Sequence, residues 1–569
     1  MAGSPTIRVT REKDASVNQT LNDLAVEYWE YVLKTSPTEA LMLGDHRYDA
    51  EFEDVSRKGE DDDIKARRGF ASRAKAVDAA GLTADEKITR EVLIFLTEKD
   101  ADLKEMRTAE WEVSHTMGMQ AMLPVMVPQL PLLEPAHAEA MIPKMRGLAR
   151  AFRDVASRLR DGVAAGKTPM RSTAEKTVTQ VDGMLAIPAA ENPLGRFTGP
   201  QGWAGEAAWR DQVAKTLAAE VLPALKEWRD TVADVVVPAG RPEDRPGLCH
   251  LPDGEETYRR AMAFYTTTER TAAEIHHIGL QQIAKLADEY RVLGKEVLGT
   301  TDLSQIFSRL RDDPSLHFSD GAAVREASEK ALAKAKAAMG AWFGRLPKAD
   351  CVVAETPTGP TAFYFRPAAD GSRPGRFFVN TADPTRWGRY EIESMAYHEG
   401  IPGHHLQLAI AGELEGGIPE FRKRAYIAAY GEGWGLYTER LADEMGLYSG
   451  PLERIGMLSA DSMRAGRLVI DTGLHSMGWT RQQAIDYFRA NSPMSQGTIE
   501  GEVDRYIAVP GQALAYMIGR LEILRMRAEA EKKLGKKFDI KGFHDTVLGS
   551  GLVPLSTLDR MVKEWVAAN

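Results

Sequence analysis

Three histidines and a glutamate fall within eight residues of one stretch, YHEGIPGHHLQ at 397–407. Zinc hydrolases need neutral or anionic ligands, a coordination position open to water, and a carboxylate that takes the proton of that water. In the common helical form, HExxH, two histidines four residues apart share one helix face and the glutamate points towards the water. His398 and Glu399 match the start of this pattern. The stretch therefore predicts a metal site with Glu399 as its general base.

The second histidine of this stretch comes later than the helical pattern requires. His404 and His405 stand six and seven positions after His398. On a regular helix His404 would turn to another face, and His405 would lie about two turns away. The intervening GIPG contains residues that let a helix break or bulge. A distorted turn that absorbs two extra residues would return His404 to the ligand position, with His405 as the alternative second ligand.

A third ligand is expected from the stretch AAYGEGWGLYTERLADEMG, about 30 residues downstream. A glutamate on a second helix is the usual third ligand when a zinc site has two histidines. Glu432 is preferred, because the small Gly431 and Gly433 permit a close approach of helix to metal. Glu439 is then a carboxylate behind the ligands or a surface charge. The prediction is one Zn²⁺ per chain on His398, His404 and Glu432.

Helical patterns dominate the elements that must position these residues. Apolar residues recur at helical spacing over 211–236, where Pro223 predicts a kink, and over 271–294. The second of these stretches begins with a capping box formed by Thr271 and Glu274. We therefore expect a mainly α protein.

Strand signals are concentrated in one segment, residues 349–384. It contains CVVAE, TAFYF and RFFVN, separated by proline, glycine and aspartate turns. A small β-sheet is therefore predicted immediately before the His-Glu segment. An extended peptide can pair with the edge of such a sheet through its backbone.

The composition excludes several classes of protein. The 72 basic and 82 acidic residues give a net charge of −10, which argues against nucleic acid or an anionic membrane as the main partner. The two cysteines, Cys249 and Cys351, build neither a disulfide framework nor a cysteine metal cluster. The N-terminus lacks an apolar signal region, and four prolines interrupt the most apolar stretch, 117–135. These features predict a cytoplasmic protein with no nucleic-acid and no membrane partner.

Several motifs, in order along the chain, resemble the bacterial family named domain of unknown function 885 (DUF885). They are ETYRRAMAFYTTTERTAAEIHHIGL, RPGRFFVNTADP, YHEGIPGHHLQ, GEGWGLYTE, RLVIDTGLHSMGWT and YIAVPGQALAYMIG. The resemblance runs from about residue 20 to the C-terminus. It implies a zinc-dependent peptidase whose fold is similar to the largely helical oligopeptidases related to thimet oligopeptidase and angiotensin-converting enzyme.

In that group two helical lobes flank a deep central channel with zinc at its floor. The resemblance thus implies an N-terminal extension over 1–18 and a single metallopeptidase unit over 19–569. Its N-terminal helical lobe would cover about 19–250. The lobe carrying the metal site, with the small sheet beside the metal-site helix, would cover about 251–569.

The resemblance also implies roles for residues outside the metal site. In oligopeptidases a tyrosine on a late helix donates a hydrogen bond to the oxyanion, a task that suits a neutral phenol. Tyr516 is the first choice for this donor, followed by Tyr506 and His475. Arginine matches a carboxylate with two parallel hydrogen bonds. The residues expected to hold the substrate backbone or its terminal carboxylate are Arg376, Asn380 and Arg505, together with the strand RFFVN.

The predicted activity is hydrolysis of peptide or peptide-like amide bonds in small substrates, since a narrow channel excludes folded proteins. One alternative is a metalloenzyme that is not a peptidase, because two histidines and a carboxylate also hold iron in oxygenases. A specialised amide hydrolase of secondary metabolism belongs to the same alternative. Another is a non-catalytic protein with a closed structural site that includes His405, although Glu399 argues for hydrolysis. The sequence leaves the oligomeric state open.

Overall fold

The computed structural model describes the backbone of residues 8–357, 359–368, 371 and 373–569, and side chains from Thr20 onward. It is mainly helical with one three-stranded sheet, which confirms the expected fold class. The helices before the sheet are α1 (Arg8–Thr35), α2 (Pro37–Met42), α3 (Arg57–Ala76), α4 (Ala84–Lys104), α5 (Met119–Met126), α6 (Pro135–Ala164), α7 (Arg171–Leu185), α8 (Glu206–Thr216), α9 (Leu222–Thr231), α10 (Val237–Ala239), α11 (Gly254–Thr266), α12 (Ala272–Leu298), α13 (Leu303–Asp312) and α14 (Gly321–Trp342).

The helices after the sheet carry the candidate site. They are α15 (Ile392–Glu399), α16 (His404–Gly412), α17 (Glu420–Arg424), α18 (Ala428–Glu444), α19 (Pro451–Ser476), α20 (Arg481–Asn491), α21 (Gln496–Ala508), α22 (Ala515–Leu534), α23 (Ile540–Leu548) and α24 (Leu555–Ala568). Residues 1–7 of the expected N-terminal extension lie outside the described residues, and residues 8–18 belong to α1.

Local sequence signals account for several of these boundaries. Thr271 and Glu274 form the expected capping box at the start of α12. The kink expected at Pro223 takes the form of a π-helical turn, Leu217–Val221, which ends two residues before that proline. A second π-helical turn, Val232–Val236, precedes the next proline in the same way. Proline offers no N–H and clashes with the preceding turn, so the backbone there leaves the regular α pattern.

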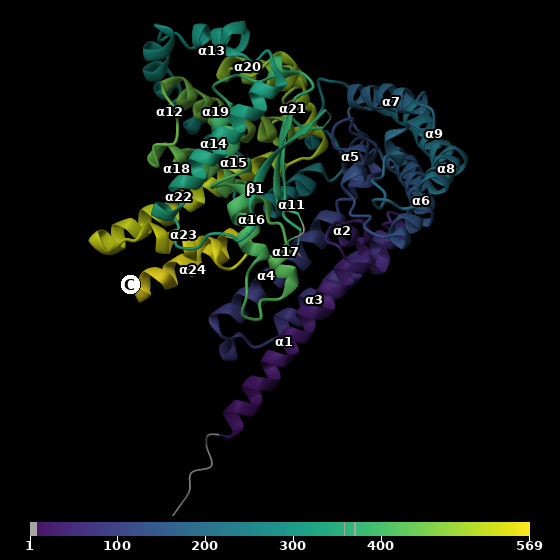
Figure 1. The fold of residues 1–569 in the computed structure, drawn as a ribbon, viewed down its shortest axis with the longest axis horizontal. Helices are drawn as coiled ribbons and strands as arrows, with labels where there is room; N and C mark the ends of the chain where they lie inside the picture. The colour runs from purple at the N-terminus through teal and green to yellow at the C-terminus, as the bar shows by residue number, and fades with distance from the viewer. Residues whose placement is uncertain (1–7, 358, 369–370, 372) are drawn as a thin grey trace, which may run out of the picture.

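Two large hydrophobic clusters organise the helices. One cluster lies between Leu41 and Val236 and joins α2 and α5–α9. The other combines α1, α3 and α4 with the part of the chain from Leu248 onward. In Figure 1, α5–α9 accordingly form a group at the right, while α12–α24 lie to the left. The hydrophobic clusters do not divide the chain at residue 250, because the early helices α1, α3 and α4 share a core with the later ones. The expected division into two lobes near residue 250 therefore stays a prediction.

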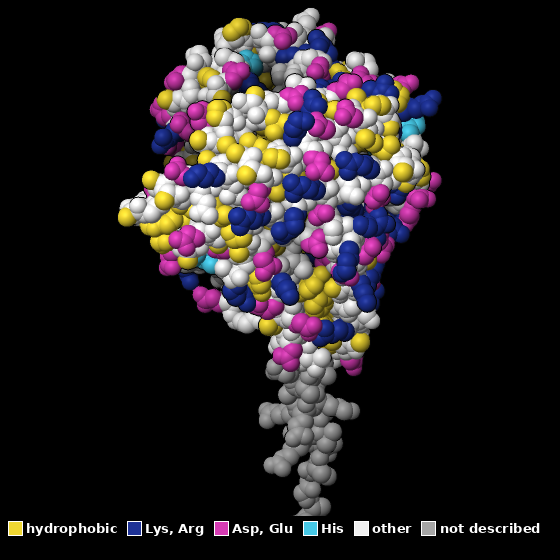
Figure 2. Space-filling model, turned by 90° about the vertical axis from the view of Figure 1, so that its right-hand side faces the viewer, with side chains coloured by type: hydrophobic (Ala, Val, Ile, Leu, Met, Phe, Trp, Pro, Cys, Tyr) yellow, Lys and Arg dark blue, Asp and Glu magenta, His cyan; other side chains and the backbone are white. Residues whose placement is uncertain are grey.

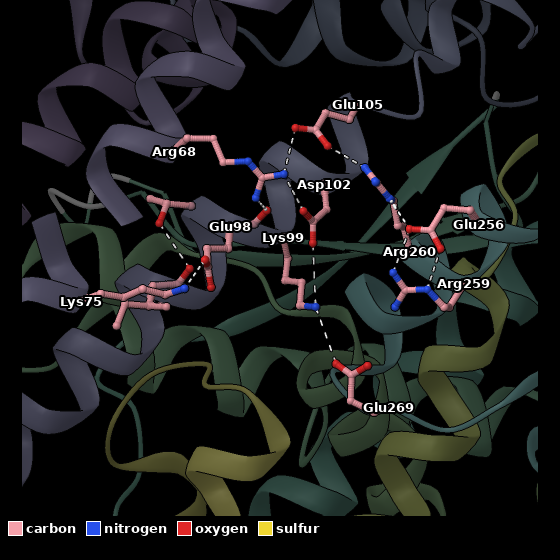
Figure 3. Close-up of polar contacts among 12 residues, drawn as sticks. Arg68, Lys75, Glu98, Lys99, Asp102, Glu105, Glu256, Arg259, Arg260 and Glu269 are labelled. Carbon is pink, nitrogen blue, oxygen red and sulfur yellow. Dashed lines mark hydrogen bonds and ion pairs between the residues drawn. The ribbon is translucent and has the colours of Figure 1, made fainter. Parts of the chain in front are cut away.

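A network of charged side chains follows the same grouping (Figure 3). Arg68 of α3 lies 2.7 Å from Asp102 of α4, and Glu105 just after α4 lies 2.6 Å from Arg260 of α11. Such partly exposed ion pairs contribute little free energy each. Their main effect is to hold α11 in a fixed position against the pair of helices α3 and α4.

The sheet contains β1 (Cys351–Thr356), β2 (Ala362–Phe365) and β3 (Gly375–Asn380), close to the three predicted segments. Its order is β1-β3-β2, with β3 parallel to β1 and antiparallel to β2. Phe377 and Val379 of β3 are buried in the larger cluster. Because side chains alternate along a strand, Arg376 and Asn380 belong to the opposite face.

No helix in the described part of the chain is long and apolar enough to cross a membrane. Both cysteines are free, as expected. On the face shown in Figure 2, basic and acidic side chains are interspersed rather than gathered into a field of one sign. This mixture agrees with the modest net charge of −10.

Candidate metal centre

The fold brings His398, His404 and Glu432 together. Helix α15 ends directly after His398, α16 begins at His404, and Glu432 lies in the second turn of α18. The Nε2 atoms of His398 and His404 lie 3.6 Å and 3.4 Å from Oε2 of Glu432. One ligand atom from each residue lies within 4.8 Å of the others, and all three side chains are largely buried. These are the three residues predicted as ligands.

The two extra residues are accommodated by ending one helix and starting another. A Cβ on Gly403 would lie 1.9 Å from the carbonyl oxygen of His398, so no larger residue fits this turn as it stands. The turn also contains a cis peptide bond between Ile401 and Pro402. The indole Nε1 of Trp434 donates to the Pro402 carbonyl at 3.0 Å, which fastens the turn to α18. The late second histidine thus follows from a break between helices, where the sequence predicted a distorted turn.

His405 lies away from this group. Its Nε2 donates to the carbonyl oxygen of Ala349 at 3.1 Å, and its Nδ1 accepts from the hydroxyl of Tyr364 at 2.9 Å. Burial lowers the pKa of His405 to about 4, which agrees with a neutral ring. Both ring nitrogens are therefore engaged elsewhere, and His404 is the histidine beside His398.

A layer of polar groups behind the three residues fixes their orientation. Nδ1 of His398 donates to Oε1 of Glu439 at 2.8 Å, and Ser394 donates to the other oxygen of this carboxylate at 2.9 Å. Such a bond selects the tautomer that leaves Nε2 free to bind a metal. Glu439 is fully buried, so it is the carboxylate behind the ligands rather than a surface charge. The hydroxyl of Tyr426 donates to Oε1 of Glu432 at 2.5 Å, which leaves Oε2 for the two histidines.

Electrostatics and spacing both fit a divalent cation. Burial acts to lower the pKa of His398, but Glu432 and Glu439 outweigh it and raise that pKa to about 9. Despite its own burial, the pKa of Glu432 is held well below its usual value by the two histidines. A metal would displace the proton of His398.

The 3.4 and 3.6 Å separations of Nε2 and Oε2 exceed the usual N–H···O distance of about 2.9 Å. Ligands on one tetrahedral ion, each about 2.0–2.1 Å from it, lie roughly 3.3 Å apart. The separations therefore resemble those of ligands around one ion. With two imidazoles and a carboxylate, the donor set suits an ion of the zinc class.

Three glycines of α18 make room for different neighbours. A Cβ on Gly435 would lie 2.7–2.8 Å from the ring of His398, and one on Gly431 would lie 2.9 Å from the ring of Tyr426. A Cβ on Gly433 would lie 2.6 Å from the backbone of Gly519 in α22. The expectation that Gly431 and Gly433 allow the close approach of this helix therefore needs correction, because Gly435 is the glycine that makes room for the His398 ring.

Glu399 follows His398 in the chain and acts electrostatically on Tyr426, and the ring of Tyr516 lies near that of His398. Glu399 is the last residue of α15, half-buried, and its carboxylate has no hydrogen-bond partner within the described part of the chain. The ring of Tyr516 is 6.3 Å from that of His398 and is tilted from it by 23°. The guanidinium of Arg467 lies 4.4 Å from the Tyr516 ring centroid. Burial raises the pKa of Tyr516, so its hydroxyl stays protonated at neutral pH.

The structure places Tyr506, His475 and Arg505 behind Tyr516 and not beside the ligands. Tyr506 donates to Glu502 and accepts from Arg467 at 2.9 Å. Both ring nitrogens of His475 bind backbone groups: Nδ1 accepts from the Leu248 amide, and Nε2 donates to the Tyr506 carbonyl. Burial lowers the pKa of His475 to about 3. Arg505 binds Glu502 and Gln512. Through Arg467, which contacts both Tyr506 and the ring of Tyr516, these residues help to position Tyr516.

Within the described residues neither Arg376 nor Asn380 makes a hydrogen bond or ion pair with His398, His404 or Glu432. Asn380 closes a turn, where its side chain donates to the Gly359 carbonyl and accepts from the Ala382 amide. Strand β3 is the central strand, so its backbone is already paired on both sides and cannot hold a substrate backbone. Among the described strands, the edge strand that packs against α15 is β2, whose residues are half-buried.

The chain was also compared with known proteins. A family model described as "Bacterial protein of unknown function (DUF885)" matches residues 37–562. The chain belongs to the DUF885 family. The chain has no match among the curated proteins.

Two solved structures share the fold of this DUF885 protein. A candidate lipoprotein from Colwellia psychrerythraea superposes with a TM-score of 0.89 at 25% identity, covering 97% of this chain and 100% of its own. A candidate lipoprotein of unknown function from Shewanella oneidensis gives a TM-score of 0.71 at 19% identity, covering 95% and 99%. Both descriptions point to a membrane-anchored or secreted protein. The prediction of a cytoplasmic protein is therefore wrong.

Sequence reasoning missed three residues of this DUF885 site. Tyr426 lies six residues before Glu432, on the segment that leads into α18. Ser394 lies one helical turn before His398 on α15. Arg467 lies on the distant helix α19 and reaches Tyr516 only through the tertiary fold. The i, i+4 spacing of Ser394 and His398 was the one signal that could have identified a partner.

Proposed function

We propose that this DUF885 protein is a metal-dependent hydrolase that cleaves peptide or peptide-like amide bonds of small substrates. The supporting observation is the convergence of two imidazole nitrogens and a carboxylate oxygen. Glu399, half-buried, follows His398 directly in the chain, and its charge acts on Tyr426, the hydrogen-bond partner of Glu432. His398, His404 and Glu432 would hold one ion of the zinc class. When bound, such an ion lowers the pKa of water and polarises a carbonyl group.

The side chains around this group suit the remaining tasks of amide hydrolysis. Glu399 has no hydrogen-bond partner among the described residues, so its carboxylate can accept a proton from water and pass it to the leaving amine. Glu439 keeps the His398 ring in one orientation. The hydroxyl of Tyr516 is protonated and can donate to negative charge that develops on the carbonyl oxygen.

The surrounding elements suggest how a substrate is held. Among the described residues, no strand pairs with the outer side of β2, which packs against α15. An extended peptide could add there as a further strand, so that backbone pairing supplies affinity without demanding a sequence. The two hydrophobic clusters would form the lobes on either side of a channel that admits only short peptides.

A closed structural site is less well supported by the geometry. It would need a fourth protein ligand, and the ring of His405 is bound to Tyr364 and Ala349 instead. With three protein ligands a coordination position remains for water, which is the arrangement of catalytic zinc sites.

The test compares wild type with Glu399→Gln and with Glu393→Gln. Glu393 lies on the same helix and binds Ser449 away from the three ligands, so it is a matched control. Each protein is purified without added metal, assayed for bound metals, and offered a pool of short peptides that is analysed by mass spectrometry. We expect zinc in all three and cleavage by wild type and Glu393→Gln alone. Absence of zinc from wild type, or equal cleavage by Glu399→Gln, would refute the proposal.

A further inference from the structure

Arg366 directly follows β2, the edge strand that packs against α15. Tyr364 lies two residues earlier, and its hydroxyl donates to Nδ1 of His405 at 2.9 Å. His405 is the neighbour of His404 at the start of α16. The end of β2 is therefore tied to the helix that begins with one of the three candidate ligands.

A second contact ties Arg366 to the segment that leads into α18. Nη1 of Arg366 donates to the carbonyl oxygen of Arg424 at 3.1 Å. Tyr426 lies two residues further along the chain, and its hydroxyl donates to Oε1 of Glu432 at 2.5 Å. The guanidinium group also interacts electrostatically with Tyr426. Arg366 thus lies between the segments that carry His404 and Glu432.

The positive charge of Arg366 has no counter-ion within the described part of the chain. None of its nitrogen atoms forms an ion pair with a carboxylate there, and Glu39 of α2 acts on it only from a greater distance. Burial and the positive charge of Arg424 lower the pKa of Arg366. A partly buried charge without a partner is unfavourable, and an anion bound beside it would remove much of that cost.

The remaining N–H groups of Arg366 are open to a ligand. Nε and Nη2, which form one edge of the guanidinium plane, have no partner among the described residues and are reached by solvent. Other arginines of the candidate site differ, because Nε of Arg464 and Nη1 of Arg467 lack partners but are sealed from solvent. Arg467 and Arg505 already share the carboxylate of Glu502. Arg366 alone of these four combines an unpaired charge with accessible donors.

The residues around Arg366 line an enclosed cleft and not the outer surface. Tyr426 is 43% exposed, yet burial raises its pKa well above the usual value. Glu39 is also exposed, and burial raises its pKa as well. Desolvation of a group that solvent still reaches indicates the wall of a cleft. Arg366 interacts with both residues, and α2 belongs to the other hydrophobic cluster, so the guanidinium faces the space between the two clusters.

We propose that Arg366 binds a carboxylate of the substrate, and that the substrates are short peptides with a free C-terminal carboxylate. This inference rests on the proposed hydrolase function and adds the substrate class to it. Two parallel N–H groups, such as Nε and Nη2, match the two oxygens of a carboxylate. A peptide that adds to the outer side of β2 as a further strand would reach Arg366 at the end of that strand.

The first test measures binding of three small probes to the full-length protein by calorimetry. The probes are N-acetyl-alanyl-alanine, its C-terminal carboxamide, and the carboxamide of N-acetyl-glutamyl-alanine. Wild type should bind the free acid about 10–100-fold more tightly than its carboxamide, as expected for a charge-assisted pair of hydrogen bonds. Arg366→Gln should bind the two alike. The control Arg325→Gln, which changes an exposed arginine of α14 paired with Glu329, should keep the wild-type ratio.

Three outcomes of the binding test would overturn the proposal. Wild type could bind the free acid and its carboxamide equally, or Arg366→Gln could keep the full preference. Tight binding of the glutamyl carboxamide, lost in Arg366→Gln, would show that the site takes a side-chain carboxylate and not the C-terminus. If Arg366→Gln is unfolded, as judged by thermal unfolding, Arg366→Lys decides: it keeps the charge but not the two parallel donors, and a ratio equal to that of wild type would then refute the proposal.

The second test measures cleavage of matched peptides that end in a free carboxylate or a carboxamide. Arg366→Gln should raise KM for the free acid by about 10–100-fold and leave kcat, zinc content and cleavage of the carboxamide unchanged. Equal slowing of both peptides would indicate a merely structural role and would overturn the proposal. If wild type binds the free acid through Arg366 but cleaves no peptide, the hydrolase function fails while the carboxylate site stands. If it cleaves both peptides equally well, the function stands and the carboxylate site fails.

Discussion

Replacement of Glu439 by glutamine tests whether the layer behind the ligands controls metal affinity. In Glu439→Gln the side-chain amide would still accept a hydrogen bond from Nδ1 of His398 but would carry no charge. Loss of such a partner typically weakens metal binding by about 10–100-fold, or about 1.4–2.7 kcal/mol. This intrinsic loss is the first of two opposing effects.

The second effect comes from the proton on His398. Glu432 and Glu439 raise the pKa of His398 to about 9. At pH 7 the bound proton therefore lowers the apparent zinc affinity by about 100-fold. Removing the charge of Glu439 lowers the pKa of His398, so the proton competes less with zinc in the variant than in wild type. At pH 7 this gain offsets much of the intrinsic loss, and the net loss of zinc affinity in Glu439→Gln should be small. Near pH 9 the proton hardly competes in either protein, so the net loss should approach the full value of about 10–100-fold.

The assay is competition between the protein and a chromophoric chelator for zinc, repeated from pH 6.5 to pH 9. The control is Glu444→Gln, the same substitution on the same helix, where the carboxylate binds Arg527. That control should match wild type at every pH. The reasoning is refuted if Glu439→Gln and Glu444→Gln behave alike, or if the loss in Glu439→Gln is largest at the acid end.

Three further predictions concern residues around the ligands. Gly435→Ala would place a methyl group 2.7 Å from the His398 ring, so the zinc content of the purified protein should fall to near zero. The control Gly497→Ala adds its methyl group in open space and should keep the wild-type zinc content, which metal analysis measures in both variants. Tyr516→Phe should lower kcat by about 10²–10³-fold with zinc content unchanged, as expected for loss of an oxyanion donor; an unchanged kcat would exclude that role. Burial raises the pKa of Asp471 to about 7 in the folded protein, so stability should fall as pH rises from its unfolded pKa of about 3.9 towards 7. Asp471→Asn should flatten this dependence in denaturant unfolding, and a slope equal to that of wild type would contradict the assignment.

Much of the local structure could be predicted because its signals are short-range. The capping box at Thr271 fixes the start of α12, and the three strand segments match β1, β2 and β3 within one or two residues. Their pairing could not be predicted, because β3 lies between β1 and β2 although it is last in the chain. A strand's place in a sheet depends on long-range contacts, and this is why RFFVN was wrongly expected to hold the substrate backbone.

The same distinction applies to the candidate centre. Residue types and spacing led to His398, Glu399, His404 and Glu432, because each is carried by a recognisable helix. The choice between His404 and His405 depends on where Tyr364 and the Ala349 carbonyl lie, and no spacing rule contains that information. Tyr506 and His475 are residue types that often act in catalysis, but here their polar atoms are hydrogen-bonded to Arg467 and to the Tyr506 carbonyl. These partners are distant in the sequence or depend on the tertiary fold, so the sequence did not reveal them.

The contact between Gly433 and Gly519 fixes two helices of the candidate centre against each other. A Cβ on Gly519 would lie 1.8 Å from the carbonyl oxygen of Ala429, so α18 and α22 meet main chain to main chain. The main-chain separation of Glu432 and Tyr516, one on each helix, is thereby set by backbone contact. Tyr426 precedes α18 and is 43% exposed, yet its hydroxyl donates to Oε1 of Glu432. A shift of α18 against α22 would therefore move Glu432 relative to Tyr516 and strain its bond to Tyr426 at the same time.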